Sequence, residues 1–296
     1  LHTRRVLESY LTDIPDSDWG SDKSNIAIAM AASNAIMFLL NDENEYENPY
    51  LWDIFDAGVN GQDLLAIEVF PEGTSEYMNS TERDATYEEV LHFMHGFGVQ
   101  LALPAMQNAI ESAMLNAINN DVYNPLSDLP EDDFDEEYFA MGLECYFGLW
   151  AHDPNGDGFC GDQEYAFITR EAMAIGDSAL FAIINGFFGE AWEYTAVLPQ
   201  GFNSNFFMIN QEGLDYTYRS QYLKNIETSG DQSINFYGND FSNQIVGTNG
   251  NNTFIGYGGD DILIGGSGVD RAIYRGDYNY YAILPPFVTS DSSFQI

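Results

Sequence analysis

Apolar residues with helical spacing, separated by short polar breaks, run from residue 1 to about residue 228. An alanine-rich run between Asn25 and Leu40 has apolar side chains spaced as in one buried helix. The same spacing predicts further helices over 86–98, 105–119, 135–151 and 169–188. The strongest strand pattern here is Leu64 to Phe70, which stops at a Pro-Glu-Gly turn. We therefore expect a mainly helical domain over residues 1–228.

The pattern changes after residue 228, where glycine, asparagine and aspartate dominate and apolar residues recur every nine positions. Four units begin at Gly238, Gly247, Gly256 and Gly265. In each unit the sixth position is Asn or Asp and the eighth is apolar. Six residues of turn followed by three of strand, repeated in this way, predict a parallel roll with the eighth side chain inside. The fold class is thus α+β, a helical N-terminal domain followed by a short parallel β-roll over 229–275, with 276–296 as a roll-capping segment or the start of a further unit.

These repeats resemble the RTX, or haemolysin-type, calcium-binding β-roll over residues 238–273. The resemblance implies that Asn243 stacks on Asp261 and Asn252 on Asp270, because successive repeats fall on opposite faces. Residues 229–237 read as a degenerate first turn with Phe236 buried. Turn carbonyls and position-six side chains would be the calcium ligands: Asn243, Asn252, Gly256, Gly259, Asp261, Gly265, Gly268 and Asp270. Since two positions hold Asn instead of Asp, we expect one or two calcium ions. The alternative is a Gly/Asn-rich linker with accidental periodicity.

A second cluster of oxygen donors lies between Asp153 and Glu164. Its spacing is that of the twelve-residue EF-hand loop, with glycine at position 6 and these ligand positions: Asp153, Asn155, Asp157, the Phe159 carbonyl and Glu164. Helical patterns over 135–151 and 165–173 flank it. Because no second loop is found, we expect a static structural calcium site and not a switch. The alternative is an acidic turn.

The net charge is strongly negative, with 47 acidic and 9 basic residues giving a formal charge of −38. A basic surface for nucleic acid or anionic membrane cannot be assembled from so few cations. The 21 Phe and 19 Tyr residues argue against disorder. A compact chain with this charge requires bound cations or high salt, and calcium is the cation that carboxylate and carbonyl oxygens favour.

The compartment is inferred from what the chain lacks as well as from its calcium motifs. No stretch has the roughly 18 apolar residues of a transmembrane span, and the first residues do not resemble a signal peptide. The sequence starts abruptly and ends without closing a motif, so we expect a processed or partial chain. Cys145 and Cys160 could form one bridge or remain two free thiols. We expect a secreted or cell-surface protein.

Two of the four histidines lie on the predicted helix 86–98 together with acidic residues. Glu88, His92 and His95 fall within about 60° on one helical face, an arrangement able to bind a metal ion. With Glu137-Tyr138-Phe139-Ala140, this segment resembles a degenerate gluzincin metallopeptidase motif of the anthrax lethal factor type. The resemblance implies His92 and Glu137 as zinc ligands and Glu89 as the general base. Glu88 stands where the family has its first histidine, and His95 is a further candidate ligand.

Other interpretations of this cluster remain open. Thr86 and Glu89 fit a capping box, Glu88 suits the helix dipole, and His92 suits a polar helix face. Our first hypothesis is therefore a structural or interaction module with a degenerate metallopeptidase-like domain. The second is a calcium-stabilised, zinc-type metallohydrolase that uses His92, Glu89 and Glu137. The third, suggested by the aromatic content, is an extracellular fibre or carbohydrate-binding component with self-assembly or matrix partners.

Overall fold

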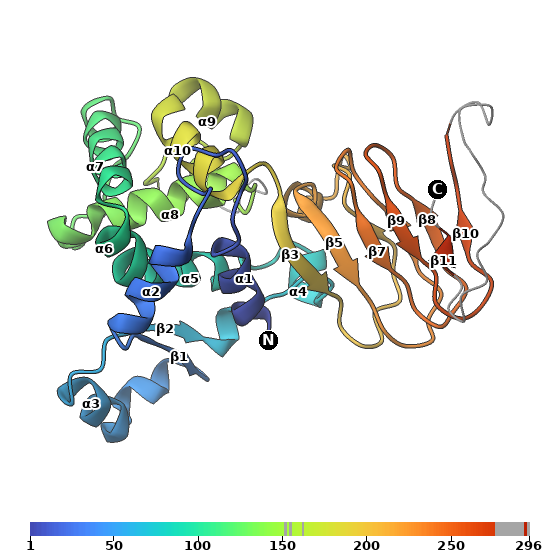
Figure 1. Ribbon diagram of the computed structural model, residues 1–296, viewed down its shortest axis with the longest axis horizontal. Coiled ribbons are helices and arrows are strands. Elements are labelled where there is room, and N and C mark those ends of the chain that lie inside the picture. Colours follow the sequence, from blue (N-terminus) through green and yellow to red (C-terminus); the bar gives the residue numbers. More distant parts are fainter. Residues whose placement is uncertain (151–152, 154–155, 162, 276–292, 295–296) are drawn as a thin grey trace. The chain divides into compact units, whose positions relative to one another are not determined.

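The computed structural model describes residues 1–150, 153, 156–161, 163–275 and 293–294. The chain forms two compact units (Figure 1), the first from Leu1–Phe70 with Glu82–Glu190 and the second from Pro71–Thr81 with Ala191–Ile296. A helical N-terminal region and a C-terminal set of parallel strands confirm the predicted α+β class. Sequence composition placed a boundary after residue 228, whereas the compact units divide at residue 190. The second unit therefore includes a segment without repeats.

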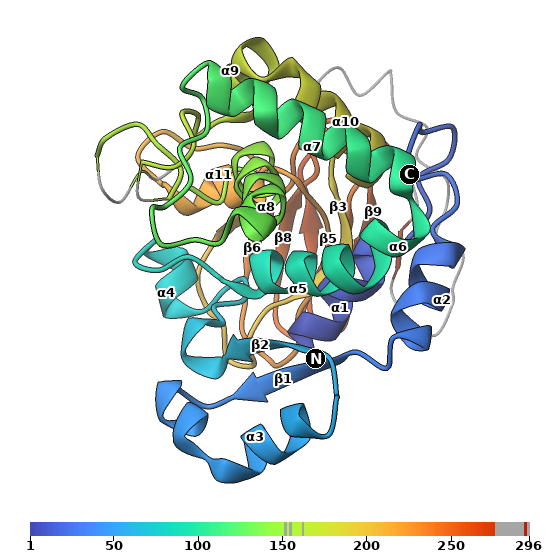
Figure 2. The same cartoon turned by 90° about the vertical axis from the view of Figure 1, so that its left-hand side faces the viewer.

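The first unit is mostly helical. Polar side chains cap its helices: Asp177 accepts the N–H of Leu180 at 3.3 Å, and Thr169 accepts that of Ala172 at 3.3 Å. Because Asp177 caps a new helix, the single helix predicted over 169–188 is two helices. In Figure 2, β1 and β2 lie on the side of α5 away from α7 and α10. The main elements are α1 (His2–Tyr10), α2 (Ser24–Ala32), β1 (Ile36–Leu40), α3 (Pro49–Asp56), β2 (Gly61–Leu65), α5 (Thr86–Met94), α6 (Gln100–Ala102), α7 (Pro104–Asn119), α8 (Phe134–Tyr146), α9 (Arg170–Gly176) and α10 (Ser178–Phe188).

The helix predicted from Asn25 to Leu40 is wrong in its second half. Helix α2 ends at Ala32, and Asn34 adopts a left-handed conformation with φ +52°. The following residues form β1, which pairs in parallel with β2, Ile36 opposite Gly61. The strand predicted over 64–70 likewise starts earlier, as β2, and gives way to a 3₁₀ turn at Ala66–Glu68. An apolar run alone does not separate a helix from a strand, and pairing between distant segments decides the outcome.

Helix α5 starts differently from the predicted capping box. The N-cap residue is Ala85, and Thr86 is the first residue of the helix. Asp84 Oδ1 accepts the N–H of Thr86 at 3.0 Å. Glu89 does not bond back to the helix start, and its Oε2 accepts from Gln62 Nε2 on β2 at 2.6 Å. After Met94 the helix widens into a π-helical turn, His95–Val99, and continues as α6. The predicted helix 86–98 is thus confirmed in place but not in its capping.

The second unit is a roll of two parallel layers, visible in Figure 1 as successive arrows from β3 to β10. One sheet has the order β10-β8-β6-β4 and the other β11-β9-β7-β5-β3. Neighbouring strands in the repeat region are offset by 18 residues, with Asn235 opposite Thr253 and Gln244 opposite Ile262. Each coil therefore uses two nonapeptides. The strands are β3 (Trp192–Val197), β4 (Phe206–Phe207), β5 (Leu223–Glu227), β6 (Asn235–Tyr237), β7 (Gln244–Val246), β8 (Thr253–Ile255), β9 (Ile262–Ile264), β10 (Arg271–Ala272) and β11 (Ser293–Phe294).

The inside of the roll holds the eighth residues of the first two repeats, and Leu263 of the third is half-buried. Ile245 is 0% exposed and Phe254 is 2% exposed, as predicted. Phe236 is buried too, and its ring stacks on that of Phe254 at 5.3 Å, which confirms residues 229–237 as a degenerate first turn. Ala272 departs from the pattern because it is exposed on β10, the last strand of its sheet. The proposed capping segment 276–296 lies outside the described residues, except for β11, which pairs antiparallel with β9.

Strands β3, β4 and β5 extend both sheets ahead of the first repeat. Ala196 of β3 pairs with Ile226 of β5, and Phe206 of β4 pairs with Phe236 of β6. These strands have no nine-residue period, so the sequence did not reveal them. They cover the inner apolar residues of the first coil. Among the described residues, no helix has the length and apolar character required to cross a bilayer.

Candidate metal centres

The turns that end in Asp261 and Asp270 fit a bound cation. A Cβ atom at Gly256 would overlap Asp261 Oδ2, and one at Gly265 would overlap Asp270 Oδ2. Only glycine leaves room for the carboxylate to fold back over its own turn. Gly259 and Gly268 have φ values of +80° and +103°, a backbone conformation that glycine adopts readily. Carboxylate and carbonyl oxygens of this kind are calcium ligands.

The predicted stacking between repeats is confirmed by hydrogen bonds. Asp261 Oδ1 accepts the backbone N–H of Asn243 at 3.0 Å, and Asp270 Oδ1 accepts that of Asn252 at 2.9 Å. Both pairs are 18 residues apart, which is one coil of the roll. Asn243 and Asn252 are 0% and 1% exposed. The position-six side chains thus form two columns, one on each side of the roll, buried at the asparagines and half-buried at the aspartates.

The EF-hand-like segment has part of the expected turn geometry. Asp153 accepts the N–H groups of Asp157 and Gly158, each at 3.1 Å, and Asp157 accepts that of Phe159 at 3.0 Å. Asn155 lies outside the described residues. Glu164, at position 12, is 7% exposed and lines a pocket on α5 and α8. Calcium binding by this loop stays a prediction.

The flanks of this loop differ from the prediction. Helix α8 ends at Tyr146, before residue 151. The helix predicted over 165–173 is wrong, because Tyr165 pairs with Cys160 in a short antiparallel bridge and α9 starts only at Arg170. Backbone pairing of Tyr165 with both Cys160 and Tyr123 competes with a helical turn at this point. Both cysteines are free and buried, and burial raises the pKa of each thiol.

Glu88, His92 and Glu137 meet between α5 and α8. One ligand atom from each lies within 4.8 Å of the others. His92 Nε2 is buried without a hydrogen-bond partner among the described residues, and its nearest carboxylate oxygen, Glu137 Oε1, is 3.9 Å away. Burial lowers the pKa of His92, which keeps the imidazole neutral and its lone pair available. The residues therefore fit a divalent transition metal.

His95 does not join this group. Its side chain is 0% exposed, its Nε2 is 2.8 Å from Gln107 Oε1, and its Nδ1 is 3.6 Å from Glu136 Oε1. The structure thus places His95 beside Gln107 and Glu136 and not with Glu88, His92 and Glu137. Its position one turn beyond His92 coincides with the start of the π-helical turn, which has a different residue spacing from the α-helix before it.

The acidic side chains around Glu88, His92 and Glu137 shift one another's pKa values. Burial, together with the neighbouring Glu88, raises the pKa of Glu137 to about 8 and that of Glu89 to about 8. Burial would raise the pKa of Glu88 as well, but Arg83 and His92 hold it below its usual value. Arg83 donates to Glu88 and also to Glu144, which is 0% exposed. This bridge was not predicted, because Arg83 and Glu144 are far apart in the chain.

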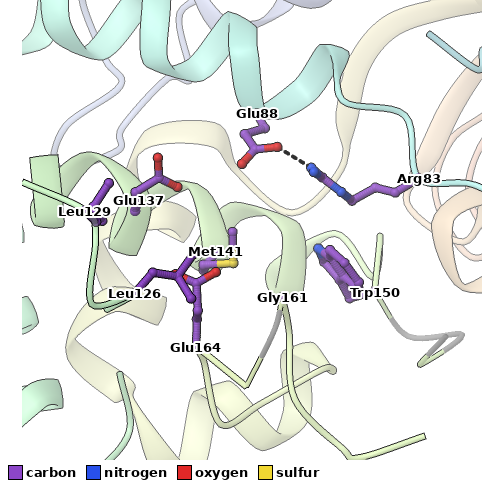
Figure 3. A pocket seen from close by; sticks show the side chains of 9 residues that line it. All are labelled: Arg83, Glu88, Leu126, Leu129, Glu137, Met141, Trp150, Gly161 and Glu164. Carbon is purple, nitrogen blue, oxygen red and sulfur yellow. Dashed lines mark hydrogen bonds and ion pairs between the residues drawn. The ribbon is translucent and has the colours of Figure 1, made fainter. Parts of the chain in front are cut away.

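A pocket of about 310 Å³ borders the group. In Figure 3, Glu88, Glu137 and Glu164 lie around it, while Arg83 reaches Glu88 from the side near Trp150. Glu89, the predicted general base, is bonded to Gln62 and does not line the pocket. The remaining lining residues are Leu126, Leu129, Met141 and Gly161.

Comparison with known proteins identifies the repeats alone. Residues 237–272 match the family model of the RTX calcium-binding nonapeptide repeat, which contains four copies of the repeat. No curated protein and no solved structure matches the chain. The metallopeptidase resemblance therefore has no support from relatives. Together with the parallel coils, the match identifies residues 237–272 as an RTX calcium-binding β-roll.

Proposed function

We propose that this chain is a secreted or cell-surface structural or interaction protein in which calcium stabilises the roll and a transition metal stabilises the helical unit. The observation that carries the second part is the approach of ligand atoms of Glu88, His92 and Glu137 to within 4.8 Å. Within the described part of the chain, His92 Nε2 has no hydrogen-bond partner. RTX repeats, typical of extracellular proteins, support the location.

The donor set favours a first-row divalent ion. Two carboxylates and one imidazole are harder and more anionic than a set of two histidines and one glutamate, so zinc competes here with ions such as manganese or iron. A dication would also offset the repulsion that raises the pKa of Glu137. Glu137 and His92 lie on different helices, so a shared ion would join α5 to α8.

A binding role is favoured over catalysis by the partners of two residues. Arg83 donates to Glu88, which neutralises the carboxylate that stands in the place of the family's first histidine. Glu89 is bonded to Gln62 and lies outside the pocket lining. Neither contact suits a site that must activate water with Glu89.

We expect the purified chain to contain about one transition-metal ion, and Glu137→Gln to reduce its affinity at least about tenfold. Elemental analysis after dialysis against trace metals measures the stoichiometry. Glu136→Gln is the matched control, because Glu136 precedes Glu137 on α8 but contacts His95 and Gln100. Equal loss in both variants, or no transition metal in the parent chain, would contradict the proposal.

A hydrolase is the second candidate, favoured by the pocket of about 310 Å³ beside the group. A bound metal would supply a Lewis acid for water activation. The pKa of Glu89, about 8, lies in the range useful for proton transfer near neutral pH. Cleavage of an unstructured peptide that Glu89→Gln abolishes while the metal is retained would favour this candidate; retained metal without cleavage in the parent chain would favour the first.

Calcium removal is expected to destabilise the roll. Extracellular modules bind calcium with dissociation constants of roughly 10⁻⁴ to 10⁻³ M, so millimolar calcium contributes on the order of 1 to 3 kcal/mol per site. Calorimetry in EGTA, compared with 10 mM calcium chosen as an excess of about tenfold or more, should show the transition of the second unit several degrees lower. Magnesium at the same concentration is the control for ionic strength. Identical melting curves would exclude stabilisation by calcium.

A further inference from the structure

The buried amide of Asn252 lies in a cage of oxygen atoms between two turns of the roll. Its Nδ2 lies 3.2 Å from the Thr248 carbonyl oxygen and 3.0 Å from that of Gly250, in its own turn. It also lies 3.2 Å from the Gly265 carbonyl oxygen and 3.1 Å from Asp270 Oδ1, in the next turn. One nitrogen thus has four oxygen neighbours from two successive coils.

Four oxygen atoms around one central atom form the arrangement of a cation site, but here the central atom is the amide nitrogen of Asn252. An amide NH₂ has only two hydrogens, so the four oxygens share two donors. The oxygen distances of 3.0 to 3.2 Å are those of N–H···O hydrogen bonds. Calcium would require its oxygens at about 2.3 to 2.6 Å. The cage is therefore spaced for the amide and too wide for the ion.

The oxygen atom of the Asn252 amide is hydrogen-bonded as well. Asn252 Oδ1 accepts the Ile234 N–H at 3.3 Å and the Thr248 hydroxyl at 3.1 Å. Exchanging oxygen and nitrogen would place Oδ1 against four acceptors and Nδ2 against the N–H of Ile234. The hydrogen-bond network thus determines the orientation of the amide. It links three successive turns, through Ile234 before it and Gly265 after it.

On the opposite side of the roll, buried side-chain amides also connect successive turns. Asn239 Nδ2 donates to the carbonyl oxygens of Gln221 at 3.0 Å and Leu223 at 2.8 Å, in the segment that precedes the repeats. Asn243 Nδ2 in turn donates to Asn239 Oδ1 at 2.9 Å. Asn239 is 4% exposed and Asn243 is 0% exposed. Here too, amide groups bridge the turns where a cation would otherwise neutralise the oxygens.

We infer that side-chain amides take the place of calcium in the first coils of this roll, residues 223–255, which hold together without the ion. Calcium dependence is confined to the later turns, Gly256–Asp261 and Gly265–Asp270, where the sixth residue is a carboxylate. Its Oδ2 lies over its own turn and is not the oxygen that accepts from Asn243 or Asn252. Asn243 and Asn252, expected from the sequence to be ligands, are then substitutes for the ion. The inference rests on the RTX roll and is independent of the metal centre in the helical unit.

Hydrogen exchange measured by mass spectrometry tests the inference on the full chain. In EGTA, amides of residues 223–255 should keep their protection within about twofold of the calcium-loaded state, while those of 256–275 should lose it at least about tenfold. Loss of protection throughout 223–275 in the parent chain would overturn the inference, whatever the behaviour of any variant.

A substitution provides the second arm. Asn252→Asp replaces the central nitrogen by oxygen, so it should add about one calcium ion per chain in equilibrium dialysis and make residues 223–255 sensitive to EGTA. Asn251→Asp is the matched control, because this exposed neighbour makes the same charge change outside the cage, where its Oδ1 accepts the Val269 N–H at 2.8 Å. An unchanged calcium stoichiometry in Asn252→Asp, or an equal gain in Asn251→Asp, would overturn the inference.

Discussion

Replacing Arg83 by leucine is expected to destabilise the helical unit by about 3 to 5 kcal/mol, because it leaves buried carboxylates without their cation. Arg83 donates to both Glu88 and Glu144, and its guanidinium lies 5.2 Å from the Trp150 ring centre. Glu144 is 0% exposed and cannot turn to solvent. Denaturant unfolding of the full chain, followed by tryptophan fluorescence and circular dichroism, measures the loss.

Two further variants separate loss of charge from loss of shape. Arg83→Lys keeps a cation but not the bridging guanidinium, so it should lose less stability than leucine. The double variant Arg83→Leu with Glu144→Leu removes the fully buried carboxylate as well and should recover part of the loss. A change below about 1 kcal/mol in Arg83→Leu would mean that the bridge is not stabilising.

The metal-free helical unit is expected to lose stability as the pH rises from about 4.5 to about 8. The pKa values of Glu89 and Glu137 are raised to about 8 from the usual 4.5, mainly by burial. In this window the folded chain holds protons that the unfolded chain releases, so unfolding becomes more favourable with each pH step. The summed effect is on the order of a few kcal/mol, reduced by solvent screening at the partly exposed Glu137.

Melting temperatures in EDTA at a series of pH values test this slope. Glu89→Gln removes one of the two groups and should flatten it. Glu136→Gln is the control, since hydrogen bonding and charge interaction with His95 outweigh burial and hold the pKa of Glu136 below its usual value. A stability that increases from pH 5 to 8 in the parent chain would be opposite in sign to this prediction.

The roll was predictable from the sequence because all four repeats have the same kind of residue at equivalent positions. An apolar eighth residue and a polar sixth residue recur, so Ile245, Phe254 and the pairing of Asn243 with Asp261 all follow. Strands β3 to β5 were not predictable, because they lack the nine-residue period. Their place is decided by pairing with β6 and β7, which a local pattern does not contain.

The helical unit was less predictable, for reasons visible at single residues. Residues 88 and 92 were found through helical spacing and residue 137 through a family resemblance, and the structure brings the three together. His95 lies apart from them, since ideal helical spacing ends where the π-helical turn begins. The bridge through Arg83 was missed because a buried ion pair between distant segments leaves no periodic signal.

The 18-residue offset between paired strands limits how such a roll can change its length during evolution. Gain or loss of two nonapeptides adds or removes a full coil and leaves every column in place. Gain or loss of one nonapeptide exchanges the two sides, so that residues of one column would face residues of the other column beyond the junction. Duplication in pairs is therefore the change that keeps neighbouring turns matched.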